Sequence, residues 1–146
     1  MRLFFLLICS LFYLPLSAQS LDYLWPTNSG NYLSSTFGET RSAHFHAGLD
    51  IKTWGREGYK VYASKEGILY RLLVTERGYG NAVYLKHPDG TFTVYAHMQR
   101  FNDAFQAMAD SIRMIDYSFE MDVIMDSLQI KVEQGDVIGY TGSTGI

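Results

Sequence analysis

Residues 81–98 read NAVYLKHPDGTFTVYAHM, and this stretch holds the clearest signal for the fold. Two short runs rich in β-branched and aromatic residues flank a Pro-Asp-Gly triplet at 88–90, and these are residues that favour tight turns. We therefore predict a β-hairpin with strands over 81–87 and 91–98. Because side chains alternate along a strand, we expect the second strand to have a polar face and an apolar face that packs on the core. The polar face would hold Thr91, Thr93, Tyr95 and His97, and the apolar face Phe92, Val94, Ala96 and Met98.

Similar short runs follow one another along the rest of the chain, with turn residues roughly every 8 to 15 positions, a spacing typical of an all-β sandwich or barrel. One segment has a helical pattern instead of a strand pattern. Residues 102–115 place Asn102 where an N-cap would stand, followed by apolar residues at helical spacing, so we predict a short helix inserted between strands. Its apolar positions are Ala104, Phe105, Met108, Ile112 and Ile115. The further predicted strands are 44–52, 59–64, 66–75, 118–125, 128–132 and 136–140.

The composition is that of a globular domain. The 146 residues include 47% hydrophobic and 15% aromatic residues, which is enough apolar material for a packed core. The 12 Lys and Arg against 15 Asp and Glu give a formal charge of −3, and no basic run follows residue 2. Nothing in the sequence would neutralise a phosphate backbone, which argues against nucleic acid as a partner.

The start of the chain has the pattern of a secretory signal peptide, which we predict over residues 1–18. Arg2 supplies a positive charge, an uncharged apolar run covers 3–16, and Ser17 and Ala18 are small residues suited to a cleavage site. The run is shorter than the roughly 20 residues that a membrane-spanning helix needs. We expect a mature domain over 19–146 in the periplasm or outside the cell, with no membrane span.

The single cysteine of the chain, Cys9, lies inside this predicted signal peptide. A lipoprotein signal would need a small residue before the cysteine, whereas Ile8 stands there, so we do not expect a lipid anchor. The mature domain would then hold no disulfide, and its stability would come from its core.

Residues 44–51, HFHAGLDI, carry the clearest chemistry. Alternation would place His44, His46, Gly48 and Asp50 on one face and four apolar residues on the other, which we expect to be the core face. Imidazole nitrogen and carboxylate oxygen are zinc ligands, so His46 and Asp50 form a candidate metal pair. Four residues of straight strand span about 13 Å, too far for both side chains to reach one ion, so we predict that the strand bends at Gly48.

The other three histidines differ in their expected roles. His97 lies at the exit of a half-buried strand, where an imidazole can hydrogen-bond a water or a developing oxyanion; a solvated or packing role is the competing interpretation. Tyr95 shares its predicted face and could line a groove, although tyrosine on a strand more often packs. His87 is expected to be part of the turn. His44 is expected either to be solvated or to contact the metal-ligating side chains without binding the metal itself.

Five segments, in order, resemble the lysostaphin and LytM-type zinc endopeptidases, which act on peptidoglycan. They are the His46-x-Gly-x-Asp50 element, Val61-Tyr62-Ala63 followed by Gly67, the turn Gly78-Tyr79-Gly80-Asn81, the strand Tyr95-Ala96-His97-Met98, and Gln134 to Gly139 leading to Thr141-Gly142-Ser143-Thr144-Gly145. The resemblance covers about residues 30 to 145. It implies a twisted antiparallel β-sheet or sandwich of the duplicated-hybrid-motif type, crossed by a groove. The helical segment is then an elaboration.

The resemblance also implies roles. His46 and Asp50 match two of the family's three zinc ligands, and His97 matches one of its two catalytic histidines. The expected activity is hydrolysis of peptide bonds in peptidoglycan stems or cross-links, with Zn²⁺ as cofactor. In the family a His-x-His element, which supplies the third ligand and the other catalytic histidine, follows the Gly-Ser-Thr-Gly turn. The sequence stops at Ile146, so we expect the chain as written to lack that element, to bind zinc weakly and to be nearly inactive.

Two other functions remain open at this point. One is a degenerate relative that binds peptidoglycan or activates an amidase without metal, although the retained His46, Asp50 and His97 argue against it. The other is a lipoyl-like carrier module, suggested by residues 132–139, which however lack a lysine at the hairpin tip. Bound zinc would separate the enzyme from both alternatives.

Overall fold

The computed structural model describes residues 23–42 and 44–145. The predicted signal peptide lies outside them, and among the described helices none is long and apolar enough to cross a membrane. In chain order the elements are β1 (Leu33–Ser35), β2 (Asp50–Ile51), β3 (Lys60–Tyr62), β4 (Gly67–Val74), β5 (Asn81–Lys86), β6 (Phe92–Phe101), α1 (Asp103–Asp116), β7 (Met121–Ile124), the 3₁₀ helix η1 (Asp126–Leu128), β8 (Lys131–Val132) and β9 (Val137–Thr141).

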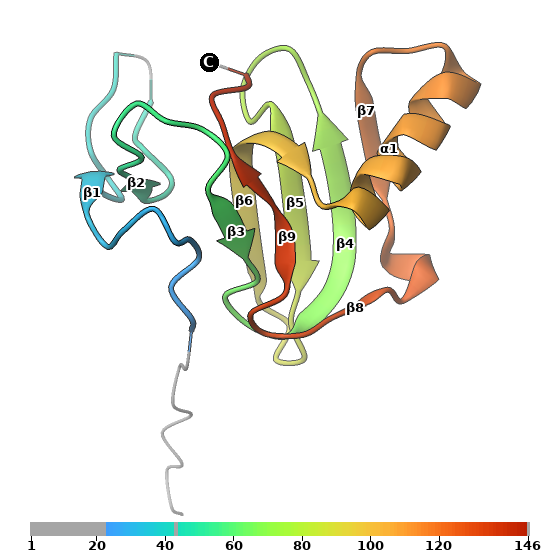
Figure 1. Ribbon diagram of the computed structural model, residues 1–146, viewed down its shortest axis with the longest axis horizontal. Helices are drawn as coiled ribbons and strands as arrows, with labels where there is room; N and C mark the ends of the chain where they lie inside the picture. Colours follow the sequence, from blue (N-terminus) through green and yellow to red (C-terminus); the bar gives the residue numbers. More distant parts are fainter. Residues whose placement is uncertain (1–22, 43, 146) are drawn as a thin grey trace, which may run out of the picture.

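The body of the molecule is one curled antiparallel sheet (Figure 1). Its strand order is β3-β9-β6-β5-β4-β7, and β8 pairs with the start of β4. A separate ribbon of β1 and β2 lies to one side, and α1 lies beside β7 on the other. The predicted all-β fold with a helical insertion is confirmed.

The hairpin between β5 and β6 is also confirmed. His87 N donates to Thr91 O at 2.8 Å and Gly90 N to His87 O at 2.9 Å, which closes the Pro-Asp-Gly turn. Leu85 of β5 is fully buried, together with residues from the neighbouring strands and from β9. The largest fully buried side chains of this core are Phe101, Leu69, Leu72, Leu85, Met98, Ile138 and Val83.

The predicted faces of β6 are wrong. Phe92 and Val94, placed on the core face, are 47% and 46% exposed, whereas Tyr95 is buried and its hydroxyl accepts a hydrogen bond from Ser64 N at 2.7 Å. Tyr95 therefore packs rather than lines a groove. Alternation fails further along because a β-bulge interrupts the strand near His97, whose φ is +56°. Beyond it Met98 is buried, as Tyr95 is.

Helix α1 begins where it was expected. The Asn102 side chain accepts a hydrogen bond from Phe105 N at 2.8 Å, which caps the first turn, and Tyr117 ends the helix in the left-handed conformation. Phe105 and Ala109 are buried against the sheet. Ile115, by contrast, is exposed, so the apolar stripe packs only along part of its length.

Several strand boundaries differ from the prediction. The segment 44–52 contains only β2, and the strand β1, which pairs with it, was not predicted. The segment 128–132 divides between η1 and β8. These strands are two or three residues long, so too few side chains alternate for a sequence pattern to show them.

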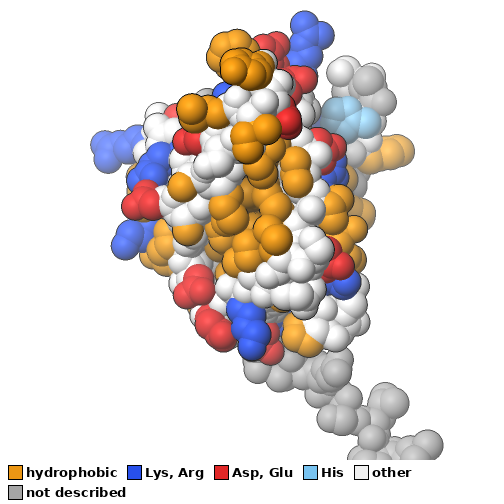
Figure 2. All heavy atoms as spheres, turned by 90° about the vertical axis from the view of Figure 1, so that its right-hand side faces the viewer, with side chains coloured by type: hydrophobic (Ala, Val, Ile, Leu, Met, Phe, Trp, Pro, Cys, Tyr) orange, Lys and Arg blue, Asp and Glu red, His pale blue; other side chains and the backbone are white. Residues whose placement is uncertain are grey.

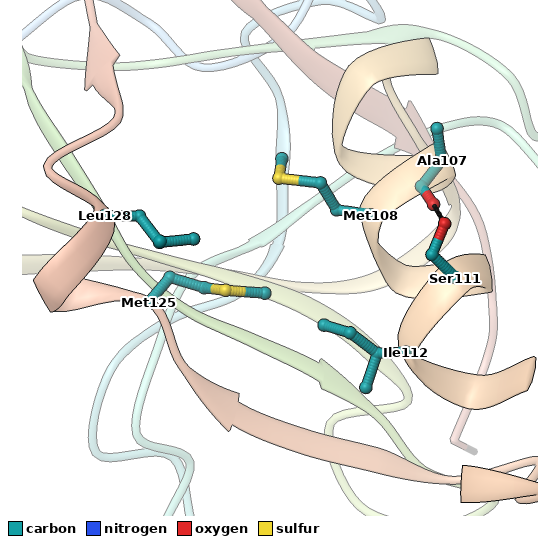
Figure 3. Close-up of a pocket in the computed structure, with 6 residues that line it drawn as sticks. All are labelled: Ala107, Met108, Ser111, Ile112, Met125 and Leu128. Carbon is teal, nitrogen blue, oxygen red and sulfur yellow. Dashed lines mark hydrogen bonds between the residues drawn. The ribbon is translucent and has the colours of Figure 1, made fainter. Parts of the chain in front are cut away.

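An apolar hollow of about 360 Å³ separates α1 from η1. Figure 2, which faces this side of the molecule, shows apolar side chains gathered around it. In Figure 3 the side chains of Met108, Ile112, Met125 and Leu128 converge on the hollow, while Ser111 turns its hydroxyl to the Ala107 carbonyl at 2.8 Å. This surface is built by the helical insertion and contains neither His46 nor His97.

Candidate metal centre

The structure brings His46 and Asp50 together. His46 Nε2 lies 3.1 Å from Asp50 Oδ1, with a bend at Gly48 between them. A Cβ added at Gly48 would lie 3.8 Å from His46 Nε2, so the glycine leaves open the space beside that nitrogen. The predicted bend is thus present, and it shortens a distance that a straight strand would keep far larger.

The apolar face of this segment does not form a core. Phe45 is 70% exposed and Leu49 56% exposed, while His46, Gly48 and Asp50 are half-buried. The prediction was wrong because β2 pairs only with β1 among the described strands, so no second layer covers the apolar side. The side that is partly buried is the one whose polar groups contact each other.

The contacts of His46 fix which ring nitrogen carries the proton. Nδ1 lies 3.0 Å from the Thr36 carbonyl oxygen and 3.0 Å from Ser35 Oγ. Since a carbonyl oxygen only accepts, Nδ1 is the protonated nitrogen of the neutral ring. Nε2 then presents a lone pair to the Asp50 carboxylate. Two acceptors at 3.1 Å repel each other unless a proton or a metal cation lies between them.

A polar network surrounds the pair. Arg41 Nη2 donates to Asp50 Oδ2 at 3.0 Å and to Ser35 Oγ at 2.7 Å, and it lies 3.5 Å from Glu39 Oε2. The Ser35 hydroxyl in turn donates to Glu39. Ser35 is nearly buried, on the strand that pairs with β2.

These residues fit a zinc ion. Two ligand atoms bound tetrahedrally at about 2.0 Å would be about 3.3 Å apart, close to the observed separation of Nε2 and Oδ1. A ligand histidine normally donates its other ring N–H to a carbonyl or carboxylate, as His46 does to Thr36. Within residues 23–42 and 44–145, however, no three His, Cys, Asp or Glu side chains lie close enough together to bind one metal ion.

His97 is positioned by the sheet. It lies in the bulge of β6, its N–H donates to Tyr79 O at 2.9 Å, and its Nδ1 lies 2.8 Å from Thr144 O. By the same argument as for His46, Nδ1 carries the proton and Nε2 the lone pair. A positive φ in a bulky residue is uncommon and often marks a functional position.

The turns that hold His97 pack tightly on each other. A Cβ on Gly80 would lie 2.4 Å from the carbonyl carbon and oxygen of Thr144, and one on Gly145 would lie 2.3 Å from Gly80 N. Thr144 Oγ1 also accepts from Asn81 N at 2.9 Å and donates to Met98 O at 2.9 Å. Two of the segments quoted for the family resemblance, 78–81 and 141–145, therefore meet beside His97.

The remaining histidines do not join the pair. His87 is buried, with Nδ1 2.7 Å from Glu66 O and Nε2 3.0 Å from Thr93 Oγ1, which makes it a structural residue of the turn. His44 is exposed, and its described contact is through its main-chain oxygen. No described contact links His97 to His46 or Asp50.

Sequence reasoning missed the residues around the pair, namely Ser35, Thr36, Glu39 and Arg41. They lie on β1 and the loop that follows it, without periodicity. Arg41 offered one weak signal, since it is a lone cation a few residues before the histidines. The contacts depend on the pairing of β1 with β2, which the sequence did not reveal.

Comparison with known proteins relates the chain to peptidases. Residues 44–110, which include His46, Asp50 and His97, match the model of Peptidase family M23. The DD-carboxypeptidase/endopeptidase Mpg of Neisseria meningitidis serogroup B and that of Neisseria gonorrhoeae are each 32% identical over 100 residues. The match covers 68% of this chain and 17% of each relative, so the chain spans about a sixth of their length.

The chain belongs to the M23 peptidases, the family of the lysostaphin and LytM-type enzymes. The resemblance inferred from the five sequence segments is thereby confirmed.

Proposed function

We propose that this chain carries the catalytic part of a secreted zinc metallo-endopeptidase that hydrolyses peptide bonds in peptidoglycan stems or cross-links. The observation that carries the proposal is the approach of His46 Nε2 and Asp50 Oδ1 to 3.1 Å, while His46 Nδ1 contacts the Thr36 carbonyl oxygen. The family and the names of its relatives support the substrate class.

In this proposal His46 and Asp50 are two protein ligands of zinc, which would polarise the scissile carbonyl and lower the pKa of a water. His97 acts as the general base in this proposal. Its Nε2 accepts a proton from the attacking water, and the imidazolium then stabilises the oxyanion or gives the proton to the departing amine. The Nδ1–H bond to Thr144 O keeps Nε2 free for both steps.

The described residues offer two ligands where a catalytic zinc usually has three. We therefore propose that these two hold zinc only weakly by themselves. The same observation favours a second candidate, a non-catalytic module that binds peptidoglycan or activates an amidase. The two candidates differ in their need for metal.

Zinc content and affinity of the purified chain would test the proposal, with the His46→Ala and Asp50→Ala variants measured alongside. We expect the wild type to bind one zinc per chain weakly, and each variant to bind zinc more weakly still. Cross-linked muropeptides then serve as substrates for the whole protein, and we expect His97→Ala to remove hydrolysis while keeping the zinc. A wild-type chain that binds zinc no better than the His46→Ala and Asp50→Ala variants, or hydrolysis that survives a chelator, would overturn the enzyme proposal in favour of the binding module.

A further inference from the structure

Both members of the metal pair are connected to one guanidinium group. Arg41 Nη2 contacts Asp50 Oδ2 directly at 3.0 Å. It also contacts Ser35 Oγ at 2.7 Å, and that hydroxyl oxygen lies 3.0 Å from His46 Nδ1. A single nitrogen atom therefore contacts one ligand and reaches the other through one hydroxyl group.

We propose that Arg41 is a positioning residue for the metal pair, an inference that rests on the proposed function. By holding Oδ2, Arg41 turns Oδ1 of Asp50 toward His46 Nε2, so that the carboxylate presents one oxygen to the ion. By donating to Ser35, it orients the hydroxyl group beside Nδ1 and so the plane of the imidazole. Partners of this kind around metal ligands commonly change affinity by about 10- to 100-fold.

The charge of Arg41 poses an objection, because a guanidinium beside a cation site repels the ion. Glu39 answers it in part. Its carboxylate lies 3.5 Å from Arg41 Nη2 and accepts the Ser35 hydroxyl, so the formal charges of Glu39 and Arg41 offset each other. Asp50 then keeps a net negative charge for the metal. Positioning and repulsion predict opposite changes in zinc affinity when Arg41 is replaced by a neutral residue. Loss of positioning would weaken zinc binding, whereas loss of repulsion would strengthen it.

Fold stability is a poor explanation for any effect of Arg41 on zinc. The side chains of Arg41 and Asp50 are 39% and 42% exposed, and ion pairs this exposed contribute little to stability. A large change in zinc affinity with an almost unchanged unfolding transition would thus indicate positioning and not loss of structure.

The experiment is zinc titration calorimetry on the purified chain as wild type, Arg41→Gln and Arg41→Lys, with Arg56→Gln as matched control. Arg56 is exposed and has no described side-chain partner. We expect Arg41→Gln to weaken zinc binding about tenfold or more. Arg41→Lys should recover most of it, since the described contacts of the Arg41 side chain converge on one nitrogen that a lysine can imitate. Arg56→Gln should stay within about twofold of the wild type, because a distant exposed charge is screened. Thermal unfolding of each metal-free variant is measured in parallel.

Unchanged or tighter zinc binding by Arg41→Gln would overturn the positioning role while the proposed function stands. Equal losses in Arg41→Gln and Arg56→Gln would overturn it too, because they would show an effect of net charge alone. If the wild type binds zinc no better than His46→Ala does, the proposed function itself fails, and the positioning role fails with it.

Discussion

His46 and His97 both have Nδ1 within hydrogen-bond distance of a main-chain carbonyl oxygen, yet different parts of the molecule hold them. His46 lies on a loop before a two-residue strand. Its main chain bonds to Gly38 and Glu39, and the side chains of Ser35, Glu39 and Arg41 surround its imidazole and its partner Asp50. His97 lies in a bulge of the ten-residue strand β6, and the main chain of two tight turns holds it.

This difference indicates which substitutions should damage each histidine. A histidine held by side chains is sensitive to polar substitutions that leave the backbone alone. A histidine held by the backbone is sensitive to changes at glycines, which permit close approach of two turns. Substitutions at glycines and at polar side chains therefore test this contrast.

Gly80→Ala should be the most disruptive change. Gly80 has φ +60°, and an added Cβ would lie 2.4 Å from the Thr144 main chain, whose carbonyl accepts the His97 hydrogen bond. We expect the free energy of unfolding to fall by about 2 kcal/mol or more and the imidazole NMR signals of His97 to shift. The control is Gly78→Ala, where φ is +77° but nothing lies within 4 Å, and about 1 kcal/mol is expected. Equal losses would show that contact with Thr144 does not matter.

Ser35→Ala should leave the fold nearly intact and weaken zinc binding about tenfold, because Ser35 links Arg41 and Glu39 to His46 Nδ1. Calorimetric titration with zinc measures the loss. Ser42→Ala, an exposed serine of the same loop, is the control and should bind zinc as the wild type does. The NMR signals of His97 should not change in either variant. Wild-type affinity in Ser35→Ala would contradict the claim that side chains position His46.

Paired substitutions by alanine and glycine compare the two backbones directly. His97 has φ +56°, so His97→Ala should be less stable than His97→Gly by about 1 kcal/mol, as measured by urea unfolding. His46 is not among the described residues with positive φ, so the order should reverse there, with His46→Gly the less stable variant. If the alanine and glycine variants had the same order of stability at both positions, the two histidines would not differ in backbone conformation as proposed.

The smallest effect concerns the hairpin at the other end of the β5–β6 ladder from His97. Hydrogen bonds from Lys65 and Thr91 hold the pKa of Asp89 well below its ordinary value of 3.8. Because the folded-state pKa is the lower one, this contribution is complete above pH 4 and is lost as the pH falls below it. The free energy of unfolding of Asp89→Asn should therefore fall less between pH 5 and pH 2 than that of the wild type. Urea unfolding at each pH measures this difference. Zinc affinity at pH 7 should not differ.

Local patterns explain what the sequence predicted correctly. The hairpin around residues 88–90, the helix capped by Asn102 and the bend at Gly48 depend on neighbouring residues, which the sequence displays. The pairing of His46 with Asp50 follows from that bend. Their role as ligands, and that of His97 in catalysis, stay predictions.

Features that depend on contacts between residues far apart in the sequence could not be predicted from local patterns. The bulge at His97 depends on turns contributed by Tyr79 and Thr144, and it removes the alternation on which the face assignment relied. Phe45 and Leu49 are exposed because, among the described strands, β2 pairs only with β1, although their spacing resembles that of a core strand. Arg41 reaches the metal pair only once β1 and β2 have paired.

The position of β9 has a consequence for how the chain folds. Residues 137–141 come late in the sequence, yet they lie between β3 and β6, and within the described residues no other strand pairs with β3 (Figure 1). A chain that leaves the ribosome N-terminus first cannot place β3 in the sheet until this late segment has been synthesised. Contacts between segments so far apart in sequence slow folding, because a long loop must close first. Within the described sheet, β3 can therefore pair only after β9 has been synthesised.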